Sequence, residues 1–343
     1  MRILRSGIEM TARPLVLITG ATGAVGPLVV GAFHDEGYAI RTLSLDHAPM
    51  GAWSADIDAR SGDVTDPSAV QAAMEGVDAV VHLAALLHIV NPLPALREKY
   101  ERINVGGTST VVAAAVRAGA KRIVLFSTIA VYGSSGGRIV TEETPPYPDT
   151  FYARTKLAAE QIVLGAKGAD GRNIGTVLRL AAVYGSRIKG NYQRLVRSLA
   201  GGRFLPVGDG SNRRTLVYDK DVARAAVLAA FHDDAAGNVF NVTDGSFHEM
   251  SEIVRTICAA LGRREPRLAL PVSPVRRTAG LLEDAARFCG FRSPVTRSTI
   301  DKYTEDIAVD GGRIQRKLGF RPRFDLTTGW AETIREMRSA GSL

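Results

Sequence analysis

The chain has 343 residues, of which 45% are apolar and 23% are charged, and this composition excludes wholesale disorder. Its formal net charge of +8 comes from basic residues scattered in short groups rather than from one dense run, which argues against nucleic acid as a partner. Neither cysteine nor any of the six histidines lies in a metal-binding spacing, so we predict no metal site.

The N-terminal segment has no continuous apolar core of the kind that marks a signal peptide. The longest apolar run, 79–90, is much shorter than the roughly 20 residues of a spanning helix. We therefore expect a cytoplasmic protein that is not stably inserted in a membrane, with residues 1–13 as a flexible tail.

Strands and helices alternate through the first half of the sequence. Apolar and β-rich runs predict strands at 14–19, 38–45, 78–84, 122–128 and 174–180, with a short one around 58–63. Helical spacing predicts helices at 24–36, from Pro67 after the cap Asp66, at 97–118 before Gly119, and at 151–167. This rhythm predicts an α/β fold built on a Rossmann-type doubly wound parallel sheet.

The alternation loosens after residue 186. A helix is expected within 190–202 and another from Asp219, and the region 262–300 is rich in proline and arginine. We predict a Rossmann domain over 14–185 together with 231–244. A smaller mixed α/β substrate lobe over 186–230 and 245–343 is expected to pack over the carboxyl ends of the strands.

The turn after the first strand reads TGATGAVG and places glycines at 20, 23 and 26. In a strand–helix turn, Gly20 permits the tight bend, Gly23 lets backbone approach a pyrophosphate, and Gly26 allows close helix packing. The helix N-terminus favours the phosphate charge. We predict a dinucleotide site that includes Thr22, Ala24 and Val25; an ordinary glycine-rich turn is the alternative.

The residue that chooses between dinucleotides lies just beyond the end of the next strand. Asp46 lies 20 residues after Gly26, the position from which a carboxylate binds the adenosine ribose and disfavours a 2′-phosphate. Arg41 could instead serve a 2′-phosphate, and both residues could equally be solvated surface charges. The spacing favours NAD, with NADP as the alternative.

Candidate catalytic residues follow the strand at 122–128. Tyr152 and Lys156 are spaced i, i+4 on one helical face. A nearby ammonium favours the phenolate, so we expect Lys156 to lower the pKa of Tyr152. Thr128, at the carboxyl end of the strand, would hold a substrate oxygen against Tyr152. A Tyr-xxx-Lys pair alone is also a common surface pattern.

The motifs TGxxGxxG, GDVTD (62–66), VVHLAA (80–85), INVGGT (103–108), STIAVYG (127–133) and YxxxK occur in this order. As a set they resemble the extended branch of the short-chain dehydrogenase/reductase superfamily, the UDP-galactose 4-epimerase-like enzymes. The resemblance covers roughly 14–335. It implies an NAD(P)-dependent enzyme that transfers hydride with a tyrosine acid/base.

The resemblance also implies roles for individual residues. Tyr152 would be the acid/base, Lys156 would also hold the nicotinamide ribose, and Thr128 matches the family's Ser/Thr. It further implies that Asp63 and Val64 flank the adenine, that Leu83, Ala84 and Ala85 line the cofactor trough, and that Asn104 supports the active-site backbone or a cofactor-side water. Plain core packing for VVHLAA and a capping role for Asn104 are the alternatives.

Substrate residues are implied by the C-terminal part of the resemblance. Arg214 would contact the diphosphate of a nucleotide sugar, and Asn191 roughly matches a nucleotide-contacting asparagine; a surface arginine is the alternative for Arg214. Leu180 departs from the proline that many relatives carry there. The segment from 271 onward also resembles relatives that act on steroids and flavonoid-like ketones, and its basic, apolar-striped sequence could touch a membrane surface.

Three functions remain open from the sequence. The first is a nucleotide-sugar 4-epimerase or 4-keto reductase/dehydrogenase. The second is a 3β-hydroxysteroid dehydrogenase-like or ketone reductase-like enzyme, and the third is a non-catalytic cofactor-binding regulatory protein. Relatives commonly pair through helices matching 97–118 and 151–167, so we expect a homodimer. Val111, Val112 and Ala115 could serve that interface or the core.

Overall fold

The fold is organised around one seven-stranded parallel sheet. The computed structural model describes residues 13–49, 51–87, 94–289, 291, 293 and 296–343. The strand order is β3-β2-β1-β4-β5-β7-β11, and every neighbouring pair is parallel. The strands are β1 (Leu15–Thr19), β2 (Ala39–Ser44), β3 (Asp58–Ser61), β4 (Ala79–His82), β5 (Arg122–Thr128), β7 (Gly175–Leu180) and β11 (Val239–Val242). The predicted Rossmann-type sheet is confirmed.

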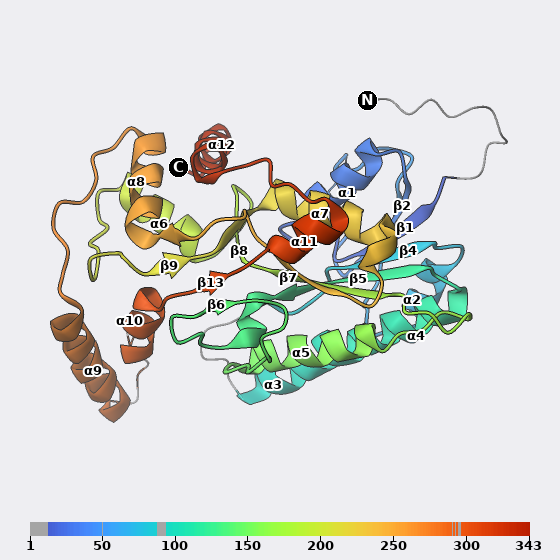
Figure 1. Cartoon of the computed structure of the whole chain (residues 1–343), viewed down its shortest axis with the longest axis horizontal. Coiled ribbons are helices and arrows are strands. Elements are labelled where there is room, and N and C mark those ends of the chain that lie inside the picture. The colour runs from blue at the N-terminus through green and yellow to red at the C-terminus, as the bar shows by residue number, and fades with distance from the viewer. Residues whose placement is uncertain (1–12, 50, 88–93, 290, 292, 294–295) are drawn as a thin grey trace.

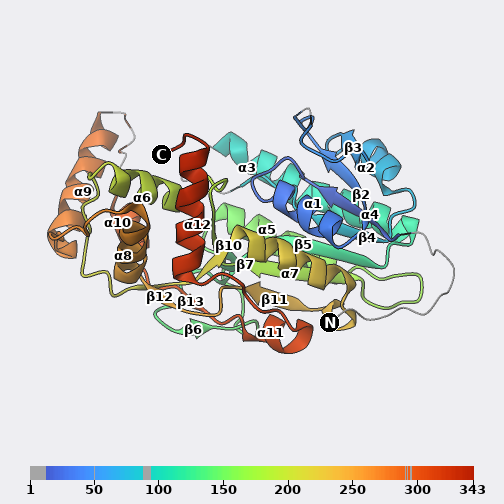
Figure 2. The ribbon, with the colours of Figure 1, turned by 90° about the horizontal axis from the view of Figure 1, so that it is seen from above.

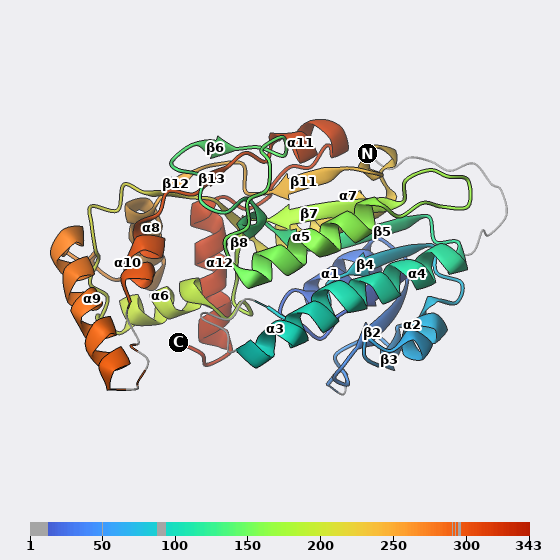
Figure 3. The ribbon, with the colours of Figure 1, turned by 90° about the horizontal axis from the view of Figure 1, so that it is seen from below.

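Helices cover both faces of this sheet, which explains why its central strands are buried and apolar. Figures 1 and 3 show α1 (Gly26–Asp35) and α7 (Asp219–Phe231) on one face, and α2 (Pro67–Met74), α4 (Thr108–Ala118) and α5 (Phe151–Leu164) on the other. Asp66 caps α2 through its side chain, as predicted. Val111, Val112 and Ala115 are buried between α4 and the sheet, so they belong to the core. Dimer formation stays a prediction.

The helix expected at 97–118 is interrupted. It runs as α3 (Pro94–Tyr100), a π-helical segment η1 (Glu101–Gly107) and α4, and Gly119 ends it in the left-handed conformation at φ 75°. Two glycines in η1 make α-helix less favourable there. A Cβ on Gly107 would lie 2.9 Å from Val64, so the segment approaches the loop after β3 closely. Single π turns of this kind are frequent at functional sites.

A second hydrophobic core lies beyond the carboxyl ends of the strands. It is formed by α6 (Asn191–Ala200), α8 (Met250–Leu261) and α12 (Leu326–Ser339), with Trp330 stacked on Tyr184 at 4.4 Å. Figure 2 shows this lobe at the opposite end of the molecule from β2 and β3. The other elements are η2 (Ile129–Tyr132), β6 (Ile139–Val140), β8 (Ala182–Tyr184), β9 (Arg213–Arg214), β10 (Leu216–Tyr218), η3 (Asp233–Ala235), β12 (His248–Glu249), α9 (Val272–Phe288), α10 (Arg297–Thr304), β13 (Ala308–Val309) and α11 (Gly312–Leu318).

Helix α7 packs on the central sheet, although we predict residues 186–230 to lie in the substrate lobe. It contacts α1 and the sheet through a row of buried alanines and Val222. Ile314 and Leu318 of α11 join the same core. The structure therefore moves α7 to the Rossmann domain, because its small side chains allow close packing on the strands; the rest of the division stays a prediction.

Candidate active site

The glycine turn after β1 lies where the sheet order reverses, between β1 and β4. Gly20 has φ 72°, and a Cβ there would lie 2.7 Å from the backbone nitrogen of Ala84. A Cβ on Gly26 would lie 2.1 Å from the carbonyl oxygen of Ala21. Only the Gly20 oxygen lies within 4 Å of a Cβ on exposed Gly23. Gly20 and Gly26 therefore fix the turn, while Gly23, whose amide donates to the Gly20 carbonyl at 3.0 Å, has no side chain that would keep a phosphate-bearing ligand from the start of α1. Ligand contacts of Thr22, Ala24 and Val25 stay predictions.

A hollow of about 290 Å³ continues from the turn along the ends of β2 and β3. Asp46 lines it together with Thr22, and the Thr22 amide donates to Ser44 Oγ at 3.3 Å. His47, which the sequence argument did not single out, also lines the hollow and lies 2.7 Å from Ser61 Oγ. Binding of an adenosine ribose by Asp46 stays a prediction.

Arg41 does not lie at this end of β2. It pairs in register with Asp58, donates to the Asp58 carboxylate at 2.6 Å, and donates to the carbonyls of Ala73 and Glu75. The alternative that Arg41 serves a 2′-phosphate is therefore wrong, because the strand register and these acceptors hold it away from the carboxyl edge.

The loops after β3 and β4 form the other wall of this region. Asp63 accepts a hydrogen bond from the Thr65 amide at 2.9 Å, and Val64 is buried against Gly107. Leu83, Ala84 and Ala85 are partly buried. The Ala84 amide lies 3.4 Å from Thr19 Oγ1, so the trough wall is tied to the end of β1. Contacts of these residues with an adenine and a nicotinamide stay predictions.

Helix α5 presents its acid/base candidates toward the carboxyl end of β5. Thr150 caps the helix, and Tyr152, Lys156 and Glu160 recur every four residues along it. The Ser127 hydroxyl donates to the Glu160 carboxylate, which ties this helical face to the end of β5. Thr128 follows directly, and its hydroxyl accepts from the Ala130 amide. The three predicted catalytic residues therefore belong to two elements that contact each other.

The electrostatics of the pair differ from the sequence expectation. Burial, with a smaller effect from Tyr100, raises the pKa of Tyr152 to about 12. Burial also lowers the pKa of Lys156 to about 8, although the Glu160 carboxylate opposes this shift. The expected lowering of the Tyr152 pKa is thus not seen in the chain itself, because burial disfavours the charged phenolate.

Asn104 has a supporting position in the structure. Its side chain accepts from the Leu86 amide at 2.7 Å and donates to the Leu86 carbonyl and to Thr155 Oγ1. It therefore joins the loop after β4 to α5, next to Tyr152 and Lys156. This is the backbone-supporting role that the resemblance implied, and direct cofactor contact stays a prediction.

A buried ion pair lies below the catalytic face, and the sequence argument missed it. Arg179 of β7 donates to the Glu160 carboxylate at 2.7 Å, and both side chains are at most 5% exposed. The Arg179 guanidinium also lies over the ring of Tyr132, 4.7 Å from its centroid. The sequence does hold one indication that Glu160 belongs to the site: it lies eight residues after Tyr152, which places both on one face of α5.

His82 links β1, β4 and the start of α4. Its Nδ1 lies 2.7 Å from Thr19 Oγ1, and its Nε2 lies 3.0 Å from Thr108 Oγ1. Because the Thr108 hydroxyl donates to the Asn104 carbonyl, it accepts from His82 Nε2, which leaves Nδ1 to accept from Thr19. A neutral imidazole satisfies this arrangement. Burial, assisted by the Lys156 charge, lowers the pKa of His82 from 6.5 to about 3.

We therefore expect stability to fall on acidification. The unfolded chain protonates His82 below about pH 6.5, whereas the folded chain keeps the imidazole neutral. The stability that depends on neutral His82 is therefore complete above pH 6.5 and is lost progressively below it. The loss is about 1.4 kcal/mol per pH unit, or about 2 kcal/mol between pH 6.5 and pH 5. Urea denaturation at both pH values should show a correspondingly smaller loss for His82→Gln. His34→Gln, at the surface, should keep the full loss; an equally steep loss in His82→Gln would contradict this assignment.

The predicted substrate residues lie in the second lobe. Asn191 is exposed at the first turn of α6. Arg214 in β9 donates to the carbonyls of Lys302 and Tyr303 at 2.7 Å, and its charge acts on Tyr192, the neighbour of Asn191. The structure thus brings the start of α6 close to Arg214. The adjacent Arg213 is instead bound by the Asp306 carboxylate.

Comparison with known proteins decides the family. Residues 16–243 match the profile of the NAD dependent epimerase/dehydratase family. The chain belongs to this family. The predicted resemblance is confirmed, and the chain is an enzyme of NAD-dependent epimerase/dehydratase type.

Relatives in this family have different named substrates. The chain is 30% identical over 335 residues to 3β-hydroxysteroid dehydrogenase/Δ5→4-isomerase of Mycobacterium tuberculosis, covering 93% of this chain and 89% of that protein. It is 28% identical over 323 residues to N-acetyl-α-D-glucosaminyl-diphospho-ditrans,octacis-undecaprenol 4-epimerase of Escherichia coli O157:H7, covering 93% and 94%. A solved structure, MoeE5 in complex with UDP-glucose and NAD, is 27% identical with a TM-score of 0.73 and covers 95% of this chain and 99% of that one.

Proposed function

We propose that this family member is a nucleotide-sugar 4-epimerase or 4-keto reductase/dehydrogenase that uses NAD. One contact carries the proposal. Helix α5, which bears Tyr152 and Lys156, packs against the carboxyl end of β5, which bears Thr128. The residues fit the cofactor: Gly23 leaves room for a pyrophosphate, and Asp46 lines the hollow where the adenosine ribose would lie. When bound, NAD supplies a hydride acceptor or donor, and a positive charge in its oxidised form.

The chain's own residues would control the proton. Tyr152 would remove it from the reacting sugar hydroxyl and return it to the same oxygen in the reverse step. Thr128 would hold that oxygen by a hydrogen bond, and Lys156 would stabilise the phenolate. Glu160 helps to keep Lys156 charged, since its carboxylate opposes the burial effect on the Lys156 pKa. The expected site is therefore an acid/base pair fixed by buried groups behind it.

The second lobe would bind the nucleotide diphosphate. Two carbonyls hold the Arg214 Nη2, so the guanidinium is oriented before substrate arrives. A guanidinium binds diphosphate oxygens in a fork that few other side chains reproduce. The solved MoeE5 complex supports this class, because it contains UDP-glucose, and the Escherichia coli relative is named for a sugar joined through a diphosphate to undecaprenol.

Replacement of Arg214 tests the substrate class. Arg214→Gln should raise KM for a nucleotide sugar by about 10- to 100-fold with little change in kcat, since it removes a charge-assisted hydrogen bond that is made throughout the reaction. Arg213→Gln is the matched control: its partner is Asp306, so KM should stay unchanged. An unchanged KM in Arg214→Gln would remove the assigned diphosphate contact.

A second candidate is oxidation of a 3β-hydroxysteroid or a similar apolar alcohol with the same three residues. The 30% identity to the Mycobacterium tuberculosis enzyme favours it. Turnover of UDP-glucose, UDP-N-acetylglucosamine and 4-keto sugars should be compared with turnover of 3β-hydroxysteroids. Turnover of sterols alone, with an unchanged sterol KM in Arg214→Gln, would replace the first proposal with the second.

A further inference from the structure

Helix α9 packs against α10 at the end of the second lobe. The contact is made through the buried Ala279 and Gly280. Arg276 pairs with Asp301 of α10 at 2.6 Å, and Asp284 pairs with Arg297 at the start of α10. Two half-exposed ion pairs thus border the small buried contact between α9 and α10.

Large apolar side chains are exposed on α9 and just beyond it. Leu281, Leu282 and Phe288 are 70%, 59% and 93% exposed, and Phe291 just beyond the helix is 75% exposed. Leu281, Ala285 and Phe288 follow each other at i, i+4, i+7, so they form one stripe. Six of the fourteen large hydrophobic side chains exposed in the described part of the chain lie between Leu268 and Phe291. Such a concentration marks an interaction surface.

This surface lies at one end of the molecule. Figures 1, 2 and 3 all place α9 at the end of the substrate lobe farthest from β2 and β3. The segment that connects α8 to α9 runs along the same end and carries the exposed Leu268 and Leu270. A flat partner could therefore meet the connecting segment and α9 without covering the glycine turn.

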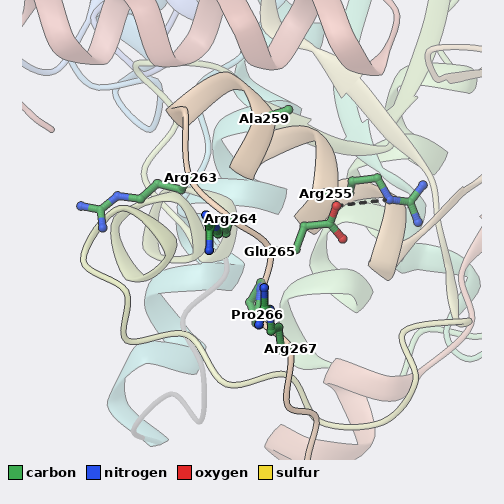
Figure 4. A pocket seen from close by; sticks show the side chains of 7 residues that line it. All are labelled: Arg255, Ala259, Arg263, Arg264, Glu265, Pro266 and Arg267. Atoms are coloured by element: carbon green, nitrogen blue, oxygen red, sulfur yellow. Dashed lines mark ion pairs between the residues drawn. The ribbon is translucent and has the colours of Figure 1, made fainter.

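Positive charge is concentrated in the same segment. Residues 255–297 contain nine arginines and three acidic residues, and therefore account for six of the chain's eight net positive charges. Arg255, Arg263, Arg264 and Arg267 line a hollow of about 490 Å³ at the end of α8 (Figure 4). Glu265 lies 3.8 Å from Arg255, while Arg263 extends to the other side. Guanidinium groups in this arrangement suit phosphate oxygens.

We propose that α9 and the arginine-rich segment before it bind the surface of an anionic phospholipid bilayer. The apolar stripe would lie among the acyl chains near the headgroups, and the arginines would contact lipid phosphates. A second copy of the chain fits less well, because two such surfaces would bring their arginines together. No helix in the described ranges is long and apolar enough to cross a bilayer, so this contact is peripheral.

Vesicle binding tests the proposal. The full chain should sediment with vesicles that contain phosphatidylglycerol at least about tenfold more strongly than with pure phosphatidylcholine vesicles, and salt should weaken the binding. Leu281→Ser combined with Phe288→Ser should reduce binding more than about tenfold. Ile139→Ser combined with Tyr147→Ser, which also removes exposed apolar side chains, is the matched control and should bind as the wild type does.

A second readout locates the contact. Cys289 is exposed and Cys258 is buried, so a polarity-sensitive fluorophore can be attached next to the stripe. Its emission should shift to the blue with anionic vesicles and should not shift with phosphatidylcholine. Absence of wild-type binding, or wild-type binding by the Leu281/Phe288 variant with an unchanged melting temperature, would overturn the proposal. So would a dimer that the variant converts to monomer while vesicles remain unbound, since the stripe would then join two copies.

Discussion

Replacement of Tyr152 by phenylalanine is expected to lower kcat by about 100- to 10,000-fold, the usual contribution of a positioned acid/base. The variant keeps the ring and its contact with Tyr100, whose centroid lies 6.2 Å away, so the helix and the cofactor trough should remain intact. Cofactor affinity, measured by quenching of tryptophan fluorescence, should therefore change little. The loss should appear in kcat and in kcat/KM equally, since the proton is transferred in the transition state.

The matched control is Tyr147→Phe. Tyr147 is 82% exposed and also loses only a hydroxyl. Its kinetics should equal those of the wild type. If Tyr152→Phe leaves every measured activity unchanged, the acid/base assignment is wrong and the non-catalytic, cofactor-binding alternative gains support.

Replacement of Glu160 by alanine is expected to destabilise the protein by about 3–5 kcal/mol. The change leaves the Arg179 guanidinium buried without its carboxylate and removes the acceptor of the Ser127 hydroxyl. Urea denaturation at pH 7 measures the effect. It is expected to be the largest single-site loss of stability among the changes considered, because an uncompensated buried charge costs far more than a lost surface contact.

Two further variants test this explanation. Glu160→Leu combined with Arg179→Met should recover most of the stability, since a buried ion pair is often replaceable by apolar groups of similar volume. Asp170→Ala, which breaks the exposed pair with Arg172, should cost less than about 1 kcal/mol. A loss of less than about 1 kcal/mol in Glu160→Ala would show that solvent reaches the guanidinium in the folded state.

The parts of the fold that the sequence predicted depend on local signals. Glycine is needed at 20 and 26 because a Cβ there would clash with the backbone of Ala84 and of Ala21, respectively. At position 23, glycine leaves the space that we predict a ligand occupies. Asp66 and Gly119 cap their helices through their own side chain and backbone conformation. Signals of this kind act over a few residues, so a sequence shows them directly.

The parts that the sequence did not predict depend on strand register. Arg179 meets Glu160 because β7 lies beside β5, with Arg179 opposite Ser127. Arg41 is held by Asp58 because β2 and β3 pair at those positions. The buried alanines of α7 were read as part of the lobe, since a short apolar helix does not indicate which sheet it covers. These contacts join residues that are distant in sequence, and only the assembled sheet brings them together.

The pKa of Tyr152 is a further case. Sequence spacing places Lys156 correctly one turn away, but it does not reveal how deeply both groups are buried. In the folded chain, desolvation moves the two pKa values apart: the pKa of Tyr152 rises from 10.0 to about 12, and the pKa of Lys156 falls from 10.5 to about 8.

Isotope transfer tests the central proposal most directly. The purified protein, supplied with oxidised NAD, is mixed with UDP-glucose that carries deuterium at C4, quenched within one turnover, and analysed by mass spectrometry of the cofactor. Our account predicts deuterium in the reduced nicotinamide for the wild type and almost none for Tyr152→Phe. Absence of deuterium in the cofactor with this sugar and with UDP-N-acetylglucosamine labelled at C4, together with transfer from a 3β-hydroxysteroid labelled at C3, would contradict the nucleotide-sugar assignment.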